Sequence, residues 1–169
     1  MESKFISESK REFLPLNSFY RWSALVALGA IAFGLTFLVF PFSQWELHFF
    51  QAAVFASAFL FGPFAGLAVG AVSSAYTGLY VIHNPWIIGG NAILGLAAAY
   101  FYTRMHPVKA ALAAFAVQLP YLLVTDIYLA STPISVEAGL AFTLLVECII
   151  CGFVAWKIAD AARPYLAKN

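Results

Sequence analysis

The sequence predicts an all-α polytopic membrane protein, with six transmembrane helices in one compact bundle and both termini in the cytoplasm. The 169-residue chain is 63% hydrophobic and 10% charged, with a mean hydropathy of +0.86, whereas a soluble domain is nearer half apolar and a quarter charged. Successive apolar stretches approach the length that crosses a bilayer. All basic side chains fall on one side of the resulting topology.

The apolar chain divides into six spans at short loops rich in Pro, Asn, Trp and charged residues. A span needs about 20 residues, because a helix rises 1.5 Å per residue. Residues 1–22 are predicted to form a cytoplasmic segment, 23–156 the six-helix domain and 157–169 a cytoplasmic tail. The predicted spans are Ser23–Phe40, Leu47–Phe61, Phe64–Ile82, Ile87–Tyr102, Val108–Leu129 and Val136–Trp156.

The first span carries small residues on one face. Ser23, Ala27, Ala30 and Gly34 recur at helical spacing, which gives this face a smooth surface. Pro41–Glu46 is predicted to be a loop before a short second span. The smooth face suits close packing, either against another helix of the chain or against a partner.

The third span carries the strongest packing signal. Gly62, Gly66, Gly70, Ser74 and Gly78 occupy every fourth position. In lipid, helices associate where small residues let their backbones approach, and Gly-x-x-x-Gly is the best-known pattern. The ridge predicts that this helix is the central one of the bundle.

The basic residues test the topology. Four precede the first span, two flank the loop between spans four and five, and three follow span six, so all nine lie on one side and the other side has none. By the positive-inside rule this side is cytoplasmic. They are Lys4, Lys10, Arg11, Arg21, Arg104, Lys109, Lys157, Arg163 and Lys168.

Polar side chains within the spans are candidates for a binding site, because an ionisable group at the centre of a membrane costs about 2.5–3.5 kcal/mol. Most of them fall in the outer half of the predicted bundle, which suggests a polar pocket that opens outward and is covered by loop residues. The candidates in the spans are Tyr80, Asn91, Gln118, Tyr121, Thr125, Asp126, Tyr128, Thr143 and Glu147, and those near the loops are Trp45, Glu46, His83 and Trp86.

Structural roles remain open for several of these residues. Gln118 and Asn91 suit hydrogen bonds between helices, and Glu147 suits a structural role or a contact with a partner protein. Tyr128 and Trp86 also fit an aromatic belt at the membrane surface. The Cys148-x-x-Cys151 pair lies in an apolar helix and is interpreted as helix filler.

Catalytic and metal-binding motifs are missing from the sequence. It contains no nucleophile elbow, zinc-protease or Walker A motif, and the three His lack metal-ligand spacing. The net charge of +1 argues against nucleic-acid binding by bulk electrostatics. A pocket without machinery for chemistry or ATP suggests binding and transport with energy from a partner, and the sequence implies no cofactor.

Two segments resemble a known family, the substrate-binding S components of energy-coupling factor (ECF) vitamin transporters. LFGPFAGLAVGAVSSAYTGL (Leu60–Leu79) is similar to the turn into the family's third helix, and IIGGNAILGLAAAYFYTR (Ile87–Arg104) is similar to its fourth helix. Many members carry an acidic residue late in the third helix, where this chain has Ser73-Ser74. The resemblance therefore names no subfamily.

The resemblance implies a mechanism. A vitamin or precursor would bind in a pocket formed mainly by helices four to six and covered by the first and third external loops. The protein would dock on a membrane coupling (T) subunit that carries two cytosolic ATPases, so it would not itself be an enzyme. The small face of helix one would form the docking surface, through Ser23, Ala27, Ala30 and Gly34.

The predicted outer half carries acidic and aromatic side chains and no Lys or Arg. A carboxylate or phosphate ligand would need a basic partner, whereas acids and aromatic rings suit a cationic or neutral aromatic ligand. Thiamine or its pyrimidine precursor is the first expected cargo, and riboflavin or a queuosine precursor is the next.

Two other classes of function remain open at this point. One is a small membrane enzyme acting on lipid, with Glu147 and Asp126 as acid and base. The other is a helix-packing membrane subunit without a ligand of its own.

Overall fold

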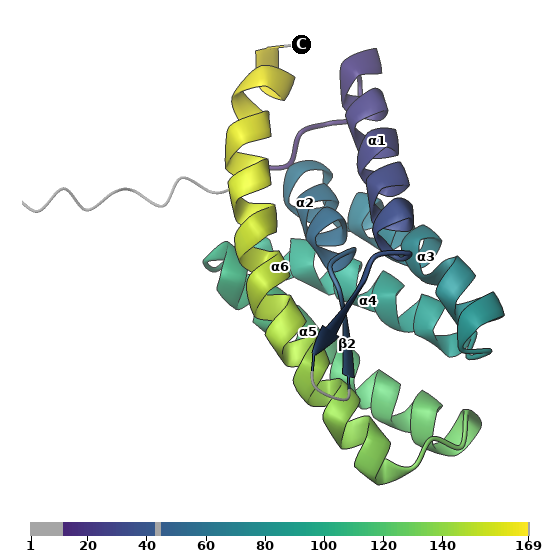
Figure 1. Cartoon of the computed structure of the whole chain (residues 1–169). Helices are drawn as coiled ribbons and strands as arrows, with labels where there is room; N and C mark the ends of the chain where they lie inside the picture. Colours follow the sequence, from purple (N-terminus) through teal and green to yellow (C-terminus); the bar gives the residue numbers. More distant parts are fainter. Residues whose placement is uncertain (1–11, 43–44, 169) are drawn as a thin grey trace, which may run out of the picture.

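The computed structural model describes residues 12–42 and 45–168, without the side chains from 42 to 46. This part of the chain folds into six α-helices, two π-helical turns and one β-hairpin (Figure 1). The elements are α1 (Phe19–Leu35), β1 (Val39–Phe42), β2 (Trp45–His48), α2 (Gln51–Phe61), α3 (Pro63–Tyr76), η1 (Thr77–Val81), α4 (Trp86–Tyr102), α5 (Pro107–Val124), η2 (Thr125–Leu129) and α6 (Ile134–Lys168).

The helices have the character of a membrane protein. Three helical segments, Pro63–Val81, Pro107–Leu129 and Ile134–Lys168, are long and apolar enough to cross a bilayer, while α1, α2 and α4 are apolar but shorter. Many large apolar side chains are exposed over the outer surface, which is characteristic of lipid-facing helices rather than of a soluble domain. The predicted helical membrane fold is confirmed, and the count of six spans stays a prediction.

A β-hairpin replaces the loop predicted at Pro41–Glu46. β1 pairs antiparallel with β2, with Val39 opposite His48. The first span, predicted to reach Phe40, therefore ends as a helix at Leu35. β-branched and aromatic residues favour strands, and Pro41 cannot continue a helix.

The centre of the bundle is α2, because all eleven of its residues are buried. It contacts α1, α3, α4 and α6. The sequence had predicted that the following helix, α3, would be the central one. However, α3 leaves Phe64 and Val72 exposed. Gly62, the first residue of the predicted ridge, lies in the α2–α3 turn with φ of 94° rather than inside a helix. Small residues along one side of a helix indicate a face that packs closely against a neighbour, whereas a helix that is buried on every side lies at the centre of a bundle.

The ridge on α3 packs against α4. A Cβ atom at Gly66 would collide with the carbonyl oxygen of Gly95, and one at Gly70 would collide with the carbonyl oxygen of Asn91. The two backbones are therefore in direct contact, which is the arrangement that the Gly-x-x-x-Gly pattern predicts.

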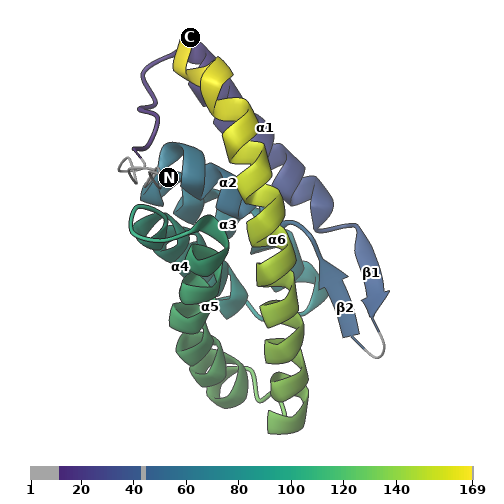
Figure 2. The ribbon, with the colours of Figure 1, turned by 90° about the vertical axis from the view of Figure 1, so that its left-hand side faces the viewer.

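Arginines tie together the end of the bundle where the chain terminates. Arg163 donates from Nη1 to the carbonyl oxygen of Glu12 and from Nη2 to that of Phe59, at 2.6 and 2.9 Å. Arg21 donates from Nε to the carbonyl oxygen of Leu166 at 2.9 Å. These bonds are possible because α6 continues as a helix through the predicted tail to Lys168 (Figure 2), so that Arg163 and the Leu166 carbonyl belong to its last turns.

Replacing Gly66 with Ala is expected to destabilise the protein by about 1–3 kcal/mol, because the α3 and α4 backbones must separate to admit a methyl group. Gly34→Ala is the matched control, since a Cβ at Gly34 meets no described atom within 4 Å. Thermal unfolding in detergent would measure both variants. Equal melting temperatures for Gly66→Ala and the wild type would contradict the packing described for this contact.

Candidate functional site

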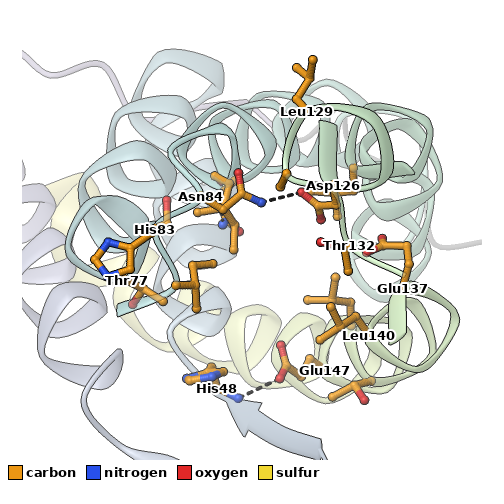
Figure 3. Close-up of a pocket in the computed structure, with 18 of the residues that line it drawn as sticks. His48, Thr77, His83, Asn84, Asp126, Leu129, Thr132, Glu137, Leu140 and Glu147 are labelled. Carbon is orange, nitrogen blue, oxygen red and sulfur yellow. Dashed lines mark hydrogen bonds between the residues drawn. The ribbon is translucent and has the colours of Figure 1, made fainter. Parts of the chain in front are cut away.

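A cavity of about 680 Å³ (Figure 3) lies where α6 begins, whereas the arginine bonds lie where α6 ends. Its walls come from the ends of α3 and α5, the starts of α4 and α6, and the segment that follows the hairpin. The volume is within the usual range for small-molecule sites. The described lining residues are His48, Phe50, Ser74, Thr77, Ile82, His83, Asn84, Ile87, Asn91, Leu122, Asp126, Leu129, Ala130, Thr132, Glu137, Leu140, Thr143, Leu144 and Glu147.

The helices α3 and α5 end in the same way at this cavity. Thr77–Pro85 (TGLYVIHNP) and Thr125–Pro133 (TDIYLASTP) each pass from a π-helical turn into a short loop that reaches a proline. In both, the residue after the π turn donates its N–H to the carbonyl oxygen five residues earlier, at 2.9 Å. His83 and Ser131 then adopt positive φ angles of 51° and 57°. Such turns are rare and concentrate at functional sites.

One hydrogen bond joins the two regions at the same wall of the cavity (Figure 3). The Asn84 side chain donates from Nδ2 to Oδ1 of Asp126 at 2.7 Å. The Asn84 Oδ1 accepts from the backbone N–H of Trp86 at 3.2 Å, which caps the start of α4. Both Asn84 and Asp126 are buried, so this bond holds the α3–α4 loop against η2.

A second carboxylate holds the hairpin to α6. Glu147 accepts from the backbone N–H of His48 at 2.7 Å, and Figure 3 shows this pair on the wall opposite Asp126. Glu147 is buried, and a carboxylate acceptor makes a strong hydrogen bond in such an apolar setting. This hydrogen bond therefore holds the end of the hairpin against α6 at the edge of the cavity.

A third carboxylate, Glu137, lies in the first turn of α6. It is 1% exposed, and its Oε2 has no hydrogen-bond partner among the described residues. Figure 3 shows it beside Thr132 on the wall that also carries Asp126. The described lining thus contains three carboxylates and neither Lys nor Arg.

Five residues named from the sequence line the cavity. They come from three helical elements, α4, η2 and α6, and from the loop between η1 and α4, and the fold brings them together around one space. They are His83, Asn91, Asp126, Thr143 and Glu147. Their presence in the lining does not itself test whether they bind a ligand, so that role stays a prediction.

Other named aromatic residues lie away from the cavity lining. Tyr80 and Tyr128 are 69% and 78% exposed, and Trp86 is half exposed. Tyr121 donates its hydroxyl to the carbonyl oxygen of Trp86 at 3.1 Å, which links α5 to α4. These positions suit the membrane surface and helix packing.

Two polar candidates, one on α5 and one at the start of η2, are buried. The Thr125 hydroxyl donates to the carbonyl oxygen of Tyr121 at 3.0 Å, and Gln118 is buried near Gly90 of α4. Trp45 and Glu46 belong to the side chains outside the described residues. Cys148 and Cys151 are free, buried thiols in the core.

The proposed docking residues of α1 all lie at its outer surface. Ser23, Ala27, Ala30 and Gly34 are exposed, so the small-residue face does not pack inside the described bundle.

Among the described residues, no group of three or more His, Cys, Asp or Glu side chains could hold a metal ion.

The sequence prediction missed Glu137, Leu140 and Leu144 on α6, although it named Thr143 and Glu147 on the same helix. Glu137, Leu140, Thr143, Leu144 and Glu147 all line the cavity and follow the spacing of one helical face. That spacing was a usable signal. The loop residues Asn84 and Thr132 had none, because the positions of loop side chains depend on the turns that carry them.

The fold is shared with a known kind of membrane protein, an S component of a transporter. A solved structure of the S component of a bacterial ECF transporter superimposes with a TM-score of 0.67, covering 87% of this chain and 97% of that one at 20% sequence identity. The sequence matches no protein-family model and no curated protein. The likeness shows the fold that the sequence resemblance implied.

Replacing Glu147 with Leu is expected to speed hydrogen exchange at the His48 amide by about tenfold or more, because a bond to a charged acceptor contributes about 1.5–3 kcal/mol. Glu147→Gln keeps a neutral acceptor and should give an intermediate rate. Exchange measured by mass spectrometry on a peptide containing His48 would show this order. Unchanged protection in Glu147→Leu would mean that the hairpin is held by other contacts.

Proposed function

We propose that the protein is the membrane substrate-binding subunit of an ECF-type transporter, and that it takes up a vitamin or vitamin precursor. The observation that carries the proposal is a cavity of about 680 Å³, lined by polar groups, at one end of a fold shared with an S component. Apolar walls with a few convergent polar groups are typical of sites for small organic molecules.

The proposed orientation places the arginine end in the cytoplasm and the cavity on the outer side. Arg21 and Arg163 lie at the end where the chain terminates, and the described cavity lining carries no basic residue other than His. The positive-inside rule then puts both termini in the cytoplasm of a six-span protein in the cell membrane. A ligand would enter from outside.

The proposed partners are a membrane coupling subunit and two cytosolic ATPases. This chain has no Walker A motif, so ATP hydrolysis is assigned to the partners. The exposed small face of α1, from Ser23 to Gly34, would pack against the coupling subunit, because small residues let helices approach closely in lipid.

The proposed cargo is thiamine or its pyrimidine precursor first, then riboflavin or a queuosine precursor. Three carboxylates in the lining support a ligand without a phosphate or carboxylate group. The prediction that aromatic side chains stack on the ligand has less support, because Tyr80, Trp86 and Tyr128 do not line the cavity. Mass spectrometry of small molecules retained through purification would test the cargo.

The alternative of a lipid enzyme receives no support from the geometry. Its expected acid and base, Glu147 and Asp126, lie on opposite walls, and each already accepts a hydrogen bond at 2.7 Å from the protein. A helix-packing subunit without a ligand would not need a polar cavity of this volume.

The double variant Ala27→Trp and Ala30→Trp is expected to abolish uptake by the reconstituted transporter while ligand binding in detergent stays intact. Both residues are exposed on α1 and neither lines the cavity. Large side chains at these positions should therefore prevent docking to the coupling subunit without affecting ligand binding. Radiolabelled uptake into liposomes and calorimetry would give the two readouts.

The control is Val117→Trp with Val124→Trp, which adds equal bulk at exposed positions on α5, a helix that packs against α4 and α6. This variant should transport normally. If the α1 variant transports as well as the control, the docking surface lies elsewhere.

A further inference from the structure

The side chain of Glu137 is buried without a partner at one of its oxygens. It is 1% exposed, and Oε2 finds no hydrogen-bond donor in the described protein. Figure 3 shows its carboxylate on the cavity side of α6, next to Thr132 and below Asp126. A buried oxygen of this kind calls for a donor that the described chain does not supply.

The other two carboxylates of the cavity differ from Glu137. Asp126 accepts from the Asn84 side chain and Glu147 accepts from the His48 backbone, both at 2.7 Å. These two residues therefore have structural bonds that fix the loop and the hairpin. Each of them uses one oxygen in these bonds. Glu137 is the lining carboxylate that has a buried oxygen without a hydrogen-bond donor among the described residues.

Protein groups near Glu137 do not balance its charge. The described lining has no Lys or Arg, and His48 and His83 lie on other walls of the cavity (Figure 3). The position in the first turn of α6 favours a negative charge, but this interaction acts along the helix axis and leaves Oε2 without a donor. Asp126 on the same wall adds further negative potential.

A positively charged organic group fits this wall better than a metal ion. No group of three His, Cys, Asp or Glu residues in the described chain could hold a metal. Leu129, Leu140 and Ile87 give the cavity apolar surface for a carbon skeleton. A cationic group that also carries an N–H or O–H donor would supply the donor that Glu137 Oε2 lacks, and its positive charge would reduce the repulsion from Asp126.

We propose that Glu137, with Asp126 and Thr132 beside it, forms a subsite for a positively charged nitrogen of the substrate. This inference rests on the proposed function and narrows it to one class of cargo, small organic cations. It places thiamine, which combines a permanent positive charge with an amino group that can donate a hydrogen bond, ahead of the neutral riboflavin. It excludes an anionic vitamin that has no cationic group.

Binding to the purified full-length protein in detergent tests the subsite, with thiamine, choline and spermidine as cationic probes and riboflavin and biotin as neutral and anionic ones. The wild type should bind at least one cation and neither of the other two. Glu137→Gln should weaken binding of that cation by about 30-fold or more, because it removes one partner of a buried charge pair. Glu137→Asp keeps the charge and should bind more tightly than Glu137→Gln.

The matched control is Asp160→Asn, which makes the same change of charge on the same helix at an exposed position outside the cavity. It should bind within about twofold of the wild type. The proposal is overturned if Glu137→Gln binds the cation as tightly as this control, or if the wild type binds no cationic probe.

The proposed transport function fails in a different way. Binding and uptake of riboflavin or biotin would contradict the proposed cation subsite but would support the proposed transport function. Tight binding of a cation that depends on Glu137, together with no uptake in liposomes containing the coupling subunit and ATPases, would support the subsite and remove the transport function.

Discussion

The direct contact between the α3 and α4 backbones is the constraint on which the site depends. Gly66 lies against Gly95, and Gly70 lies against the carbonyl of Asn91. This contact sets how α3 and α4 lie against each other, and the segment between them contributes Ile82, His83 and Asn84 to the cavity lining. Without a hydrophobic force between helices in lipid, such close packing is one of the few interactions that can set their positions.

Opposite charges occupy opposite ends of the molecule for different reasons. The arginines at the terminal end donate to main-chain carbonyls of α2, α6 and the segment before α1, so they satisfy groups that helix ends leave unpaired. The carboxylates at the other end surround an open space. Two of them hold a loop and the hairpin in place, while Glu137 keeps an oxygen without a described partner.

The pocket is built on rigid elements and on two matching turns. The π turns after α3 and α5 insert extra residues into their last turns, and the loops that follow pass through positive φ at His83 and Ser131. A π turn changes which residues face inward, so Asp126 and Leu129 line the cavity while Tyr128 faces out. The hydrogen bond from Asn84 to Asp126 joins the two regions.

The sequence by itself determined that the protein is a helical membrane protein with small residues on α3 at a helix contact, because hydropathy and residue spacing are local properties. It also singled out five residues of the cavity lining, since ionisable or polar residues in apolar helices stand out. Only the tertiary structure decided that α2 is central, that a hairpin follows α1 and that Glu137 faces the cavity. Strand pairing and the rotation of each helix about its axis depend on partners distant in the sequence, and the two π turns break the regular spacing from which facing residues were inferred.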